Sequence, residues 1–256
     1  MKIFVCVKHV PDTAAVINVE GDAGYEEPDT KFIANPYDEF GVEEAIRLVE
    51  KHGGEVVVLT VAKSAAVSTI RGALAMGAHR AILIKIDSQF LDSDLTARAL
   101  KAAMEKDGMA DIIFTGKMSV DTESFQTQYR LAGILNVPIV NDVSRLTVDG
   151  GRVRAWREVD AGQKQVVEMD LPCVIGATKG LNEPRYPSFP NVMKAQKKEI
   201  KELDIVDLGI DVSQNKVTLE RLRPVPKRAG AKMLEGTVEE QVDDLLTILK
   251  EKEKVL

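Results

Sequence analysis

The chain of 256 residues lacks several features that would place it in a familiar class. It has only two cysteines, Cys6 and Cys173, which is too few for a disulfide framework and is typical of a reducing compartment. No apolar run approaches membrane-spanning length, and residues 1–7 lead directly into a predicted strand rather than a secretory leader. We therefore expect a cytoplasmic, soluble protein in which both cysteines are small buried apolar residues.

Positive charge is not in excess, and common chemical motifs are missing. The chain has 34 lysines and arginines against 40 aspartates and glutamates, a net charge of -6, which argues against nucleic acid as the main partner. The three histidines, His9, His52 and His79, have no ligand spacing, so we expect no metal site. There is no P-loop or strand-linked GxGxxG, and no GxSxG, CxxC or HExxH motif suggests a catalytic nucleophile or general base.

Alternating strand and helix patterns fill the first half of the chain. Short, β-branched apolar runs alternate with amphipathic helical patterns, as in a sheet that is covered on both faces. The runs are residues 3–7, 56–61, 81–86 and 112–115, and the helical patterns are residues 40–51, 67–76, 93–106 and 123–135. These elements predict an α/β fold of adenine-nucleotide-binding type, with a doubly wound, mainly parallel sheet and ligands beyond the carboxyl ends of its strands.

The second half divides into three parts. Strand patterns at 143–148, 153–158 and 166–169 are joined by glycine turns, and 171–177 resumes the buried apolar type. Residues 199–233 show little periodicity, and Thr237 with Glu240 forms a capping box before an amphipathic helix. We therefore expect an α/β domain over 1–198, which includes a protruding loop at 180–198, and a C-terminal arm over 199–256. The pattern leaves open whether the last helix packs on its own domain or on another subunit, and we expect the latter because an irregular arm precedes it.

The segment 180–198 contains three prolines, Pro184, Pro187 and Pro190, which predict a stiff loop because proline is excluded from helix interiors and central strands. Among them stand apolar side chains, Leu181, Tyr186, Phe189 and Val192, and basic ones, Arg185, Lys194, Lys197 and Lys198. Two interpretations remain: the loop folds back over its own domain, or it docks on an acidic partner.

Two further segments are candidates for binding a nucleotide. In Asn35-Pro36-Tyr37-Asp38, Asn35 can cap a helix with Asp38 reaching back, or the free amides can hold an adenine or a phosphate. In residues 116–127, Gly116 allows close approach of the backbone and several hydroxyls follow, although any loop between a strand and a helix can look like this. Lys8 and Asp12, after the first strand, are expected to bond local backbone and each other.

Several motifs in a fixed order resemble the β subunit of electron transfer flavoproteins, over essentially the whole chain. They are VCVKHVPD at 5–12, NPYDEFGVEEAIRL at 35–48, ALAMGAHR at 73–80, GKMSVD at 116–121, REVDAG at 157–162, and LNEPRY at 181–186 followed by PNVMKA. The resemblance implies a heterodimer with an α subunit that holds most of an FAD. It also implies electron transfer, one electron at a time, from acyl-CoA-type or related dehydrogenases of fatty acid oxidation to a membrane quinone reductase. Such a subunit is an electron carrier without catalytic side chains of its own.

The resemblance also assigns residues. It implies a structural AMP bound by Cys6, Asn35, Pro36, Tyr37, Asp38, Val61, Gly116, Lys117, Met118, Ser119, Val120, Asp121, Thr122, Glu123, Ser124, Phe125, Gln126 and Thr127. It places Glu158 near the flavin, with Ala161 where the family usually has a glycine. The partner-docking residues that it implies are Leu181, Arg185, Tyr186, Phe189, Lys194 and Lys197, and Phe189 takes the place of the family's leucine anchor.

Two other functions remain as alternatives. A bifurcating relative would hold a second FAD in place of AMP and take electrons from NADH. That variant usually resembles DGDTAQVGP where this chain has DTESFQTQY, and it usually lacks LNEPRY, so both departures favour the AMP form. A stress-type ATP- or AMP-binding protein on the same scaffold would need a glycine-rich phosphate loop and has no use for LNEPRY.

Overall fold

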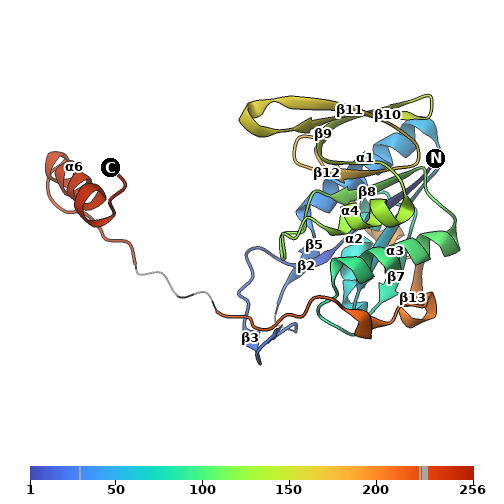
Figure 1. Cartoon of the computed structure of the whole chain (residues 1–256), viewed down its shortest axis with the longest axis horizontal. Coiled ribbons are helices and arrows are strands. Elements are labelled where there is room, and N and C mark those ends of the chain that lie inside the picture. The colour runs from blue at the N-terminus through green and yellow to red at the C-terminus, as the bar shows by residue number, and fades with distance from the viewer. Residues whose placement is uncertain (29, 225, 227–229) are drawn as a thin grey trace. The chain divides into compact units, whose positions relative to one another are not determined.

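A nine-stranded sheet forms the framework of the computed structural model, which describes residues 1–28, 30–224, 226 and 230–256 (Figure 1). The strand order is β11-β10-β9-β12-β8-β1-β6-β7-β13, and all neighbours pair in parallel except β9 with β10 and β10 with β11. The strands are β1 (Lys2–Cys6), β6 (Glu55–Ala62), β7 (Arg80–Lys85), β8 (Ile112–Gly116), β9 (Ile139–Asp149), β10 (Arg152–Glu158), β11 (Lys164–Asp170), β12 (Cys173–Ala177) and β13 (Ile200–Asp204). Two small antiparallel pairs stand apart: β2 (His9–Pro11) with β5 (Phe32–Ala34), and β3 (Val19–Glu20) with β4 (Gly24–Tyr25).

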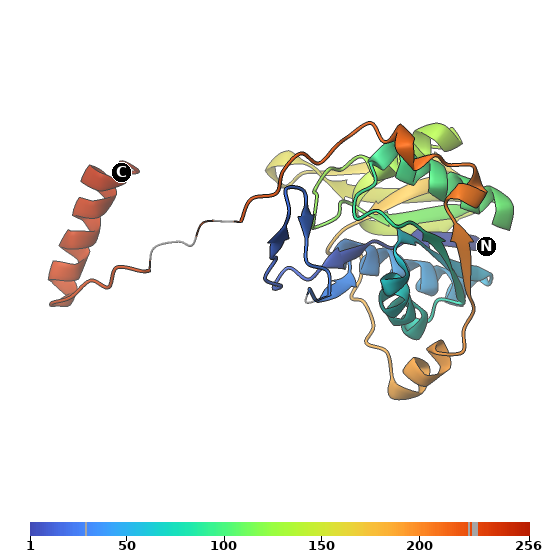
Figure 2. The ribbon, with the colours of Figure 1, turned by 90° about the horizontal axis from the view of Figure 1, so that it is seen from below.

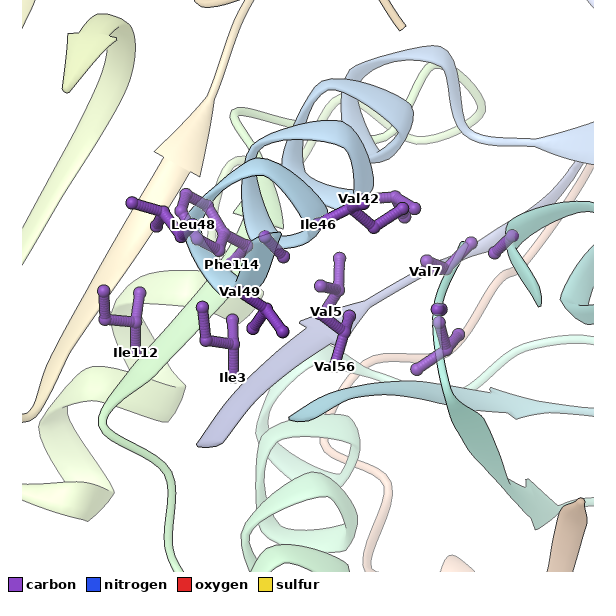
Figure 3. Close-up of a cluster of buried hydrophobic side chains, with 14 of the residues drawn as sticks. Ile3, Val5, Val7, Val42, Ile46, Leu48, Val49, Val56, Ile112 and Phe114 are labelled. Atoms are coloured by element: carbon purple, nitrogen blue, oxygen red, sulfur yellow. The ribbon is translucent and has the colours of Figure 1, made fainter. Parts of the chain in front are cut away.

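Helices cover both faces of this sheet, so the predicted doubly wound α/β fold is confirmed. Helices α1 (Pro36–His52) and α2 (Val67–Met76) pack on one face, and α3 (Ser93–Asp107) and α4 (Thr127–Leu135) pack on the other. Strand β1 shows the alternation, because Ile3 and Val5 join the first core and Phe4 joins the second. Figure 3 shows Val5 beneath Ile46 and Ile3 beneath Val49, both on the side of the sheet that α1 covers. Burial on both faces explains why the strands are continuous apolar runs.

The order of the strands creates a crevice at the carboxyl ends of the central strands. From β1 the chain passes through α1 to β6 and through α2 to β7, moving in one direction across the sheet. After α3 it returns to the other side of β1 and forms β8. The connections that leave β1 and β8 therefore diverge, and a ligand site is expected between the carboxyl ends of these two strands.

The structure differs from the predicted elements in three places. Helix α4 begins at Thr127 rather than near 123, because Glu123 and Phe125 have left-handed φ values of 46° and 55° that interrupt a helix. Strand β13 lies where the pattern predicted only an irregular arm. A helix, α5 (Phe189–Ala195), replaces part of the predicted loop, because Pro190 lies in its first turn, where the missing N–H has no cost.

The chain divides into two compact units, Met1–Leu222 and Arg223–Leu256. The second unit contains α6 (Val238–Thr247), which opens with the predicted capping box between Thr237 and Glu240 and continues as a π-helical turn over Ile248–Lys252. Its large apolar side chains, Val238, Val242, Leu245 and Leu246, are exposed. The predicted arm also includes residues 225 and 227–229, which lie outside the described residues. Of the helices described, none is long and apolar enough to cross a membrane.

Candidate functional site

A pocket of about 880 Å³ opens at the carboxyl ends of β1, β6 and β8, at the crevice that the topology creates. Cys6, Val61 and Gly116 line it from these three strands. The starts of α3 and α4 add Ser93 and Thr127, so the first turns of two helices face the same space. The first amides of a helix have no partner inside the helix, so they can bind an anion.

Asp38 ties together the floor of this pocket. One carboxylate oxygen accepts a hydrogen bond from the backbone N–H of Lys8, after β1, at 2.7 Å. The other accepts from the backbone N–H of Gly116, at the end of β8, and from the side-chain amide of Asn35, both at 2.8 Å. A single buried side chain therefore fixes the ends of two strands and the turn before α1.

Asn35 holds the loop that follows β8. Its amide nitrogen donates to the carbonyl oxygen of Met118 at 2.9 Å, and its amide oxygen accepts from the N–H of Val120 at 3.1 Å. Asn35 stands at the N-cap of α1 and bonds to Asp38, but the predicted side-chain cap is wrong in one respect, because the Asn35 side chain makes no capping bond to the helix backbone. Instead the side chain bonds to the loop after β8, and these bonds join the two candidate segments.

Gly116 is where these segments come closest. A Cβ atom at this position would lie 2.4 Å from Oδ1 of Asp38 and 2.7 Å from Cβ of Tyr37. Both of those atoms belong to the first turn of α1, so the absence of a side chain at position 116 allows the loop to pack on that turn. Glycine is required here for close approach rather than for an unusual φ angle.

Two ion pairs stand at the rim of the pocket. Lys8 pairs with Asp121 at 2.6 Å and also reaches the hydroxyl of Ser119 at 3.3 Å, and Lys63 pairs with Glu27 at 2.9 Å. The expected pairing of Lys8 with Asp12 is wrong, since Asp12 pairs with Lys31 at 2.8 Å. Ammonium and hydroxyl groups at one rim are suited to a phosphate ester.

Most of the sequence-predicted nucleotide residues surround the pocket. Those that line it are Cys6, Asn35, Asp38, Val61, Gly116, Met118, Ser119, Asp121, Thr122, Ser124, Phe125, Gln126 and Thr127. Pro36, Tyr37, Lys117, Val120 and Glu123 belong to the same segments but are not among its lining residues. Lys117 instead places its ammonium group 5.3 Å from the centre of the Tyr37 ring.

Other lining residues were missed by reasoning from the sequence. His9 and Phe32 stack with ring centres 4.4 Å apart, and Tyr25, Phe90 and Val217 also face the pocket. These residues come from the small β pairs, from the loop before α3 and from the C-terminal segment. No local motif marks them, because only the tertiary fold brings them to this edge. The flat faces of the aromatic rings among them are suited to stacking with an aromatic base.

Burial controls the ionisation of the pocket floor. Removal from water raises the pKa of Asp38 to about 7, against the lowering effect of its hydrogen bonds from Lys8, Asn35 and Gly116. The pKa of the Cys6 thiol is raised well above its usual range by burial and then by the nearby Asp38 charge. The raised pKa favours the neutral thiol of Cys6, which is a weaker nucleophile than the thiolate.

The first part of the predicted docking segment is tied to α1. Leu181 packs against the core, and the Asn182 amide donates to the carbonyl of Phe40 at 3.0 Å. The guanidinium of Arg185 bonds to Glu43 at 2.9 Å and to Glu50 at 2.6 Å, so its charge is neutralised within the chain. Of the predicted docking residues, Leu181 and Arg185 therefore support the segment rather than face outward.

Beyond Arg185 the segment projects with α5, the light orange helix in Figure 2. The side chains of Tyr186 and Phe189 are 98% and 77% exposed, and Met193 is also exposed. Lys194 and Lys197 are exposed beside them, and neither forms an ion pair with a described carboxylate. The outcome is an apolar surface with positive charge at its side, built on one short helix.

Glu158 lies elsewhere, at the end of β10, and is not among the residues that line the pocket. It is exposed and lies 3.9 Å from Lys164, the residue opposite it on β11. In the turn that follows, Ala161 adopts φ 59° and ψ 28°. This is the left-handed conformation that glycine favours, so alanine keeps the backbone geometry at a cost of about 1 kcal/mol.

Comparisons with known proteins identify the family of this chain. The family model described as "Electron transfer flavoprotein domain" matches residues 23–208. The chain is 37% identical to the electron transfer flavoprotein subunit beta of Bacillus subtilis over the full length of both chains. It is 36% identical to that of Mus musculus, covering 98% of this chain and 97% of the relative, and 37% identical to a mitochondrial one of Oryza sativa over the full length of both.

The chain belongs to the electron transfer flavoprotein family, as a β subunit. Membership establishes a role in electron transfer, and the name of the subunit implies an α partner. Two separate features of the β subunit need a functional explanation. They are the pocket at the carboxyl ends of the central strands and the exposed helix α5.

The raised pKa of Asp38 is expected to make the free energy of unfolding of this β subunit depend on pH. Its folded pKa of about 7 lies above the usual value of 3.8, so the folded chain binds the proton more tightly between these pH values. The resulting stabilisation is complete below about pH 4 and is lost as the pH rises through about 7. In urea unfolding, the unmodified chain should lose about 2 to 3 kcal/mol of unfolding free energy between pH 5 and pH 8 relative to Asp38→Asn, at about 1.4 kcal/mol per pH unit. Parallel pH profiles for the two proteins would contradict this expectation.

Proposed function

We propose that this β subunit binds AMP as a structural ligand and carries no catalytic side chains of its own. Together with its α subunit it accepts electrons from acyl-CoA-type or related dehydrogenases of fatty acid oxidation, and passes them to a membrane quinone reductase. The observation that carries the proposal is the union of both candidate segments in one pocket at the carboxyl edge of the sheet. Nucleotides are bound at this place in doubly wound folds.

The residues of the pocket fit an AMP molecule. A volume of about 880 Å³ is within the range of sites for small ligands. Ser119 and the first amides of α4 would donate hydrogen bonds to the phosphate, and the Lys8 ammonium group would join them by exchanging its bond to Asp121 for one to the phosphate. The stacked His9 and Phe32 provide a flat surface for the adenine. AMP at this position would stabilise the subunit and take no part in electron transfer.

The FAD is proposed to lie mainly on the α subunit. Its flavin ring supplies the redox chemistry, while protein groups provide orientation and electrostatics. From this chain, Glu158 is the residue proposed to approach the flavin at the subunit boundary. Its exposure and its loose pairing with Lys164 leave the carboxylate accessible to a partner.

Docking of the dehydrogenase is proposed to occur through α5. Tyr186 and Phe189 would enter an apolar surface of the dehydrogenase, and Lys194 and Lys197 would attract acidic groups around it. Long-range attraction raises the rate of encounter without making the complex permanent. A carrier must release its donor quickly, so a small anchor is suited to this role.

The predicted arm covers residues 199–256. Of this arm, the part that follows Leu222 is proposed to bind the α subunit. The exposed apolar stripe of α6, with Val238, Val242 and Leu245, would pack on the α subunit.

The location of the protein is proposed to be the cytoplasm. The two free cysteines are consistent with this location, because thiols stay reduced there.

Rapid mixing tests this function directly. The heterodimer is mixed under anaerobic conditions with an acyl-CoA-type dehydrogenase that has been reduced by its substrate. We expect the flavin absorbance of the heterodimer to be lost within the turnover time of the dehydrogenase. Reduction by NADH alone, with no response to any acyl-CoA-type dehydrogenase, would contradict the proposed donor.

A further inference from the structure

The end of α5 is held by an arginine of the neighbouring helix. Arg71 lies on α2, and its Nη1 donates to the carbonyl oxygens of Ala195 and Lys198, both at 2.6 Å. These carbonyls lie at and just beyond the C-terminus of α5, where backbone oxygens lack partners within the helix. A guanidinium at this position satisfies the carbonyls and the negative end of the helix dipole.

A lysine makes the same kind of contact in the opposite direction. Lys198 follows α5, and its ammonium group donates to the carbonyl oxygens of Leu74 at 2.8 Å and Ala78 at 2.5 Å. Those oxygens lie in the last turn of α2 and just beyond its C-terminus. An arginine of α2 therefore caps the C-terminus of α5, and a lysine just after α5 caps the C-terminus of α2. Between them Ala195 is fully buried in the core, so α5 rests directly on α2.

The other end of the segment is fixed independently. Arg185 bonds through three nitrogens to Glu43 and Glu50 of α1. The exposed residues, Tyr186 to Met193, thus lie between an anchor on α1 and an anchor on α2. Since a helix of seven residues is too short to be stable alone, its conformation depends on these anchors.

We propose that Arg71 and Lys198 are positioning residues that hold α5 so that Phe189 is presented in the orientation that docks the dehydrogenase. This inference rests on the proposed docking function of α5. Both residues act through Phe189 and contact no partner themselves. Their effect is preorganisation: a docking element that is already ordered loses less conformational freedom on binding, so the complex forms at lower concentration.

The variants Arg71→Met and Lys198→Met test the inference in the complete heterodimer. Methionine keeps an unbranched stem and removes the charged donor. The donor is the acyl-CoA-type dehydrogenase that reduces the unmodified heterodimer fastest, and steady-state rates are measured against heterodimer concentration. We expect KM for the heterodimer to rise about three- to tenfold, with kcat within about twofold, because only docking is affected. Arg98→Met on α3, an exposed arginine that pairs with Asp94, is the matched control and should leave KM unchanged.

A double-mutant cycle separates positioning from a general structural role. In a Phe189→Ala background, Arg71→Met should change KM by less than about twofold, because the residue through which it acts has been removed. With Phe189 present, Arg71→Lys retains a cation for the carbonyls, so its KM should be much closer to that of the unmodified heterodimer than the KM of Arg71→Met. FAD content and AMP content should be equal in all variants.

Four results would decide against the proposals, and they are distinguishable. An unchanged KM in both methionine variants overturns the positioning role, and so does the same rise in KM with and without Phe189. An effect that follows loss of FAD or AMP also overturns it, since the anchors would then be general structural contacts. If Phe189→Ala itself has no effect on KM, the docking function of α5 is overturned.

Discussion

Replacing Phe189 with alanine is expected to lower the kcat/KM of the dehydrogenase for this heterodimer about 10- to 100-fold. The Phe189 side chain is 77% exposed on α5. Burying a phenylalanine side chain contributes about 1.5 to 3 kcal/mol, and each 1.4 kcal/mol is a factor of about ten. Stopped-flow reduction of the heterodimer flavin by the dehydrogenase measures the change.

The same substitution should leave the FAD content and the heterodimer intact, because Phe189 is not part of either core cluster. Met109→Ala, in a loop before β8, removes another exposed apolar side chain and is the matched control. It should leave the reduction rate unchanged. Equal reduction rates for Phe189→Ala and the unmodified protein would show that α5 is not the docking site.

The second large effect is expected at the floor of the pocket. Gly116→Ala should weaken AMP binding at least about tenfold, because overpacking a dense site costs about 1 to 3 kcal/mol. The added Cβ would lie 2.4 Å from Oδ1 of Asp38 and 3.0 Å from Nδ2 of Asn35. The turn and the loop must therefore separate, which disrupts the bonds from Asn35 to Met118 and Val120. Titration calorimetry with AMP on heterodimer freed of nucleotide measures the loss.

Gly133→Ala provides the control for this experiment. Gly133 lies within α4, and nothing lies within 4 Å of the position where its Cβ would be. An alanine in a helix interior is about 0.5 to 1 kcal/mol more favourable than glycine, so this variant should bind AMP normally and unfold at a slightly higher temperature. Equal AMP affinity for both variants would contradict the role given to Gly116.

Much of the fold could be predicted from periodicity, because the buried strands and their helices carry strong local patterns. Helix α2 has the bounds that the sequence predicted, and α3 begins at the predicted Ser93. The start of α4 could not be predicted, since nothing in the local sequence marks the left-handed conformations of Glu123 and Phe125, which are residues other than glycine. Helix α5 was missed because prolines break helices in the interior but not in the first turn.

The candidate site was only partly visible in the sequence. Both segments of the pocket could be named, but the bonds that join them link residues about 80 positions apart, as from Asn35 to Met118. A local pattern cannot distinguish a capping asparagine from one that crosses to another loop. The roles of Arg71 and Lys198 were hidden for the same reason, because they bond to backbone carbonyls, which carry no sequence signal.

The nucleotide content of the purified heterodimer tests the account most directly. The complex of this chain with its α subunit is denatured, and the released FAD and AMP are quantified per heterodimer. One FAD and one AMP are expected, since the pocket of this chain is proposed to hold AMP while the FAD lies mainly on the α subunit. Two FAD and no AMP would contradict the account, and would identify this chain as part of a bifurcating complex in which NADH is the donor.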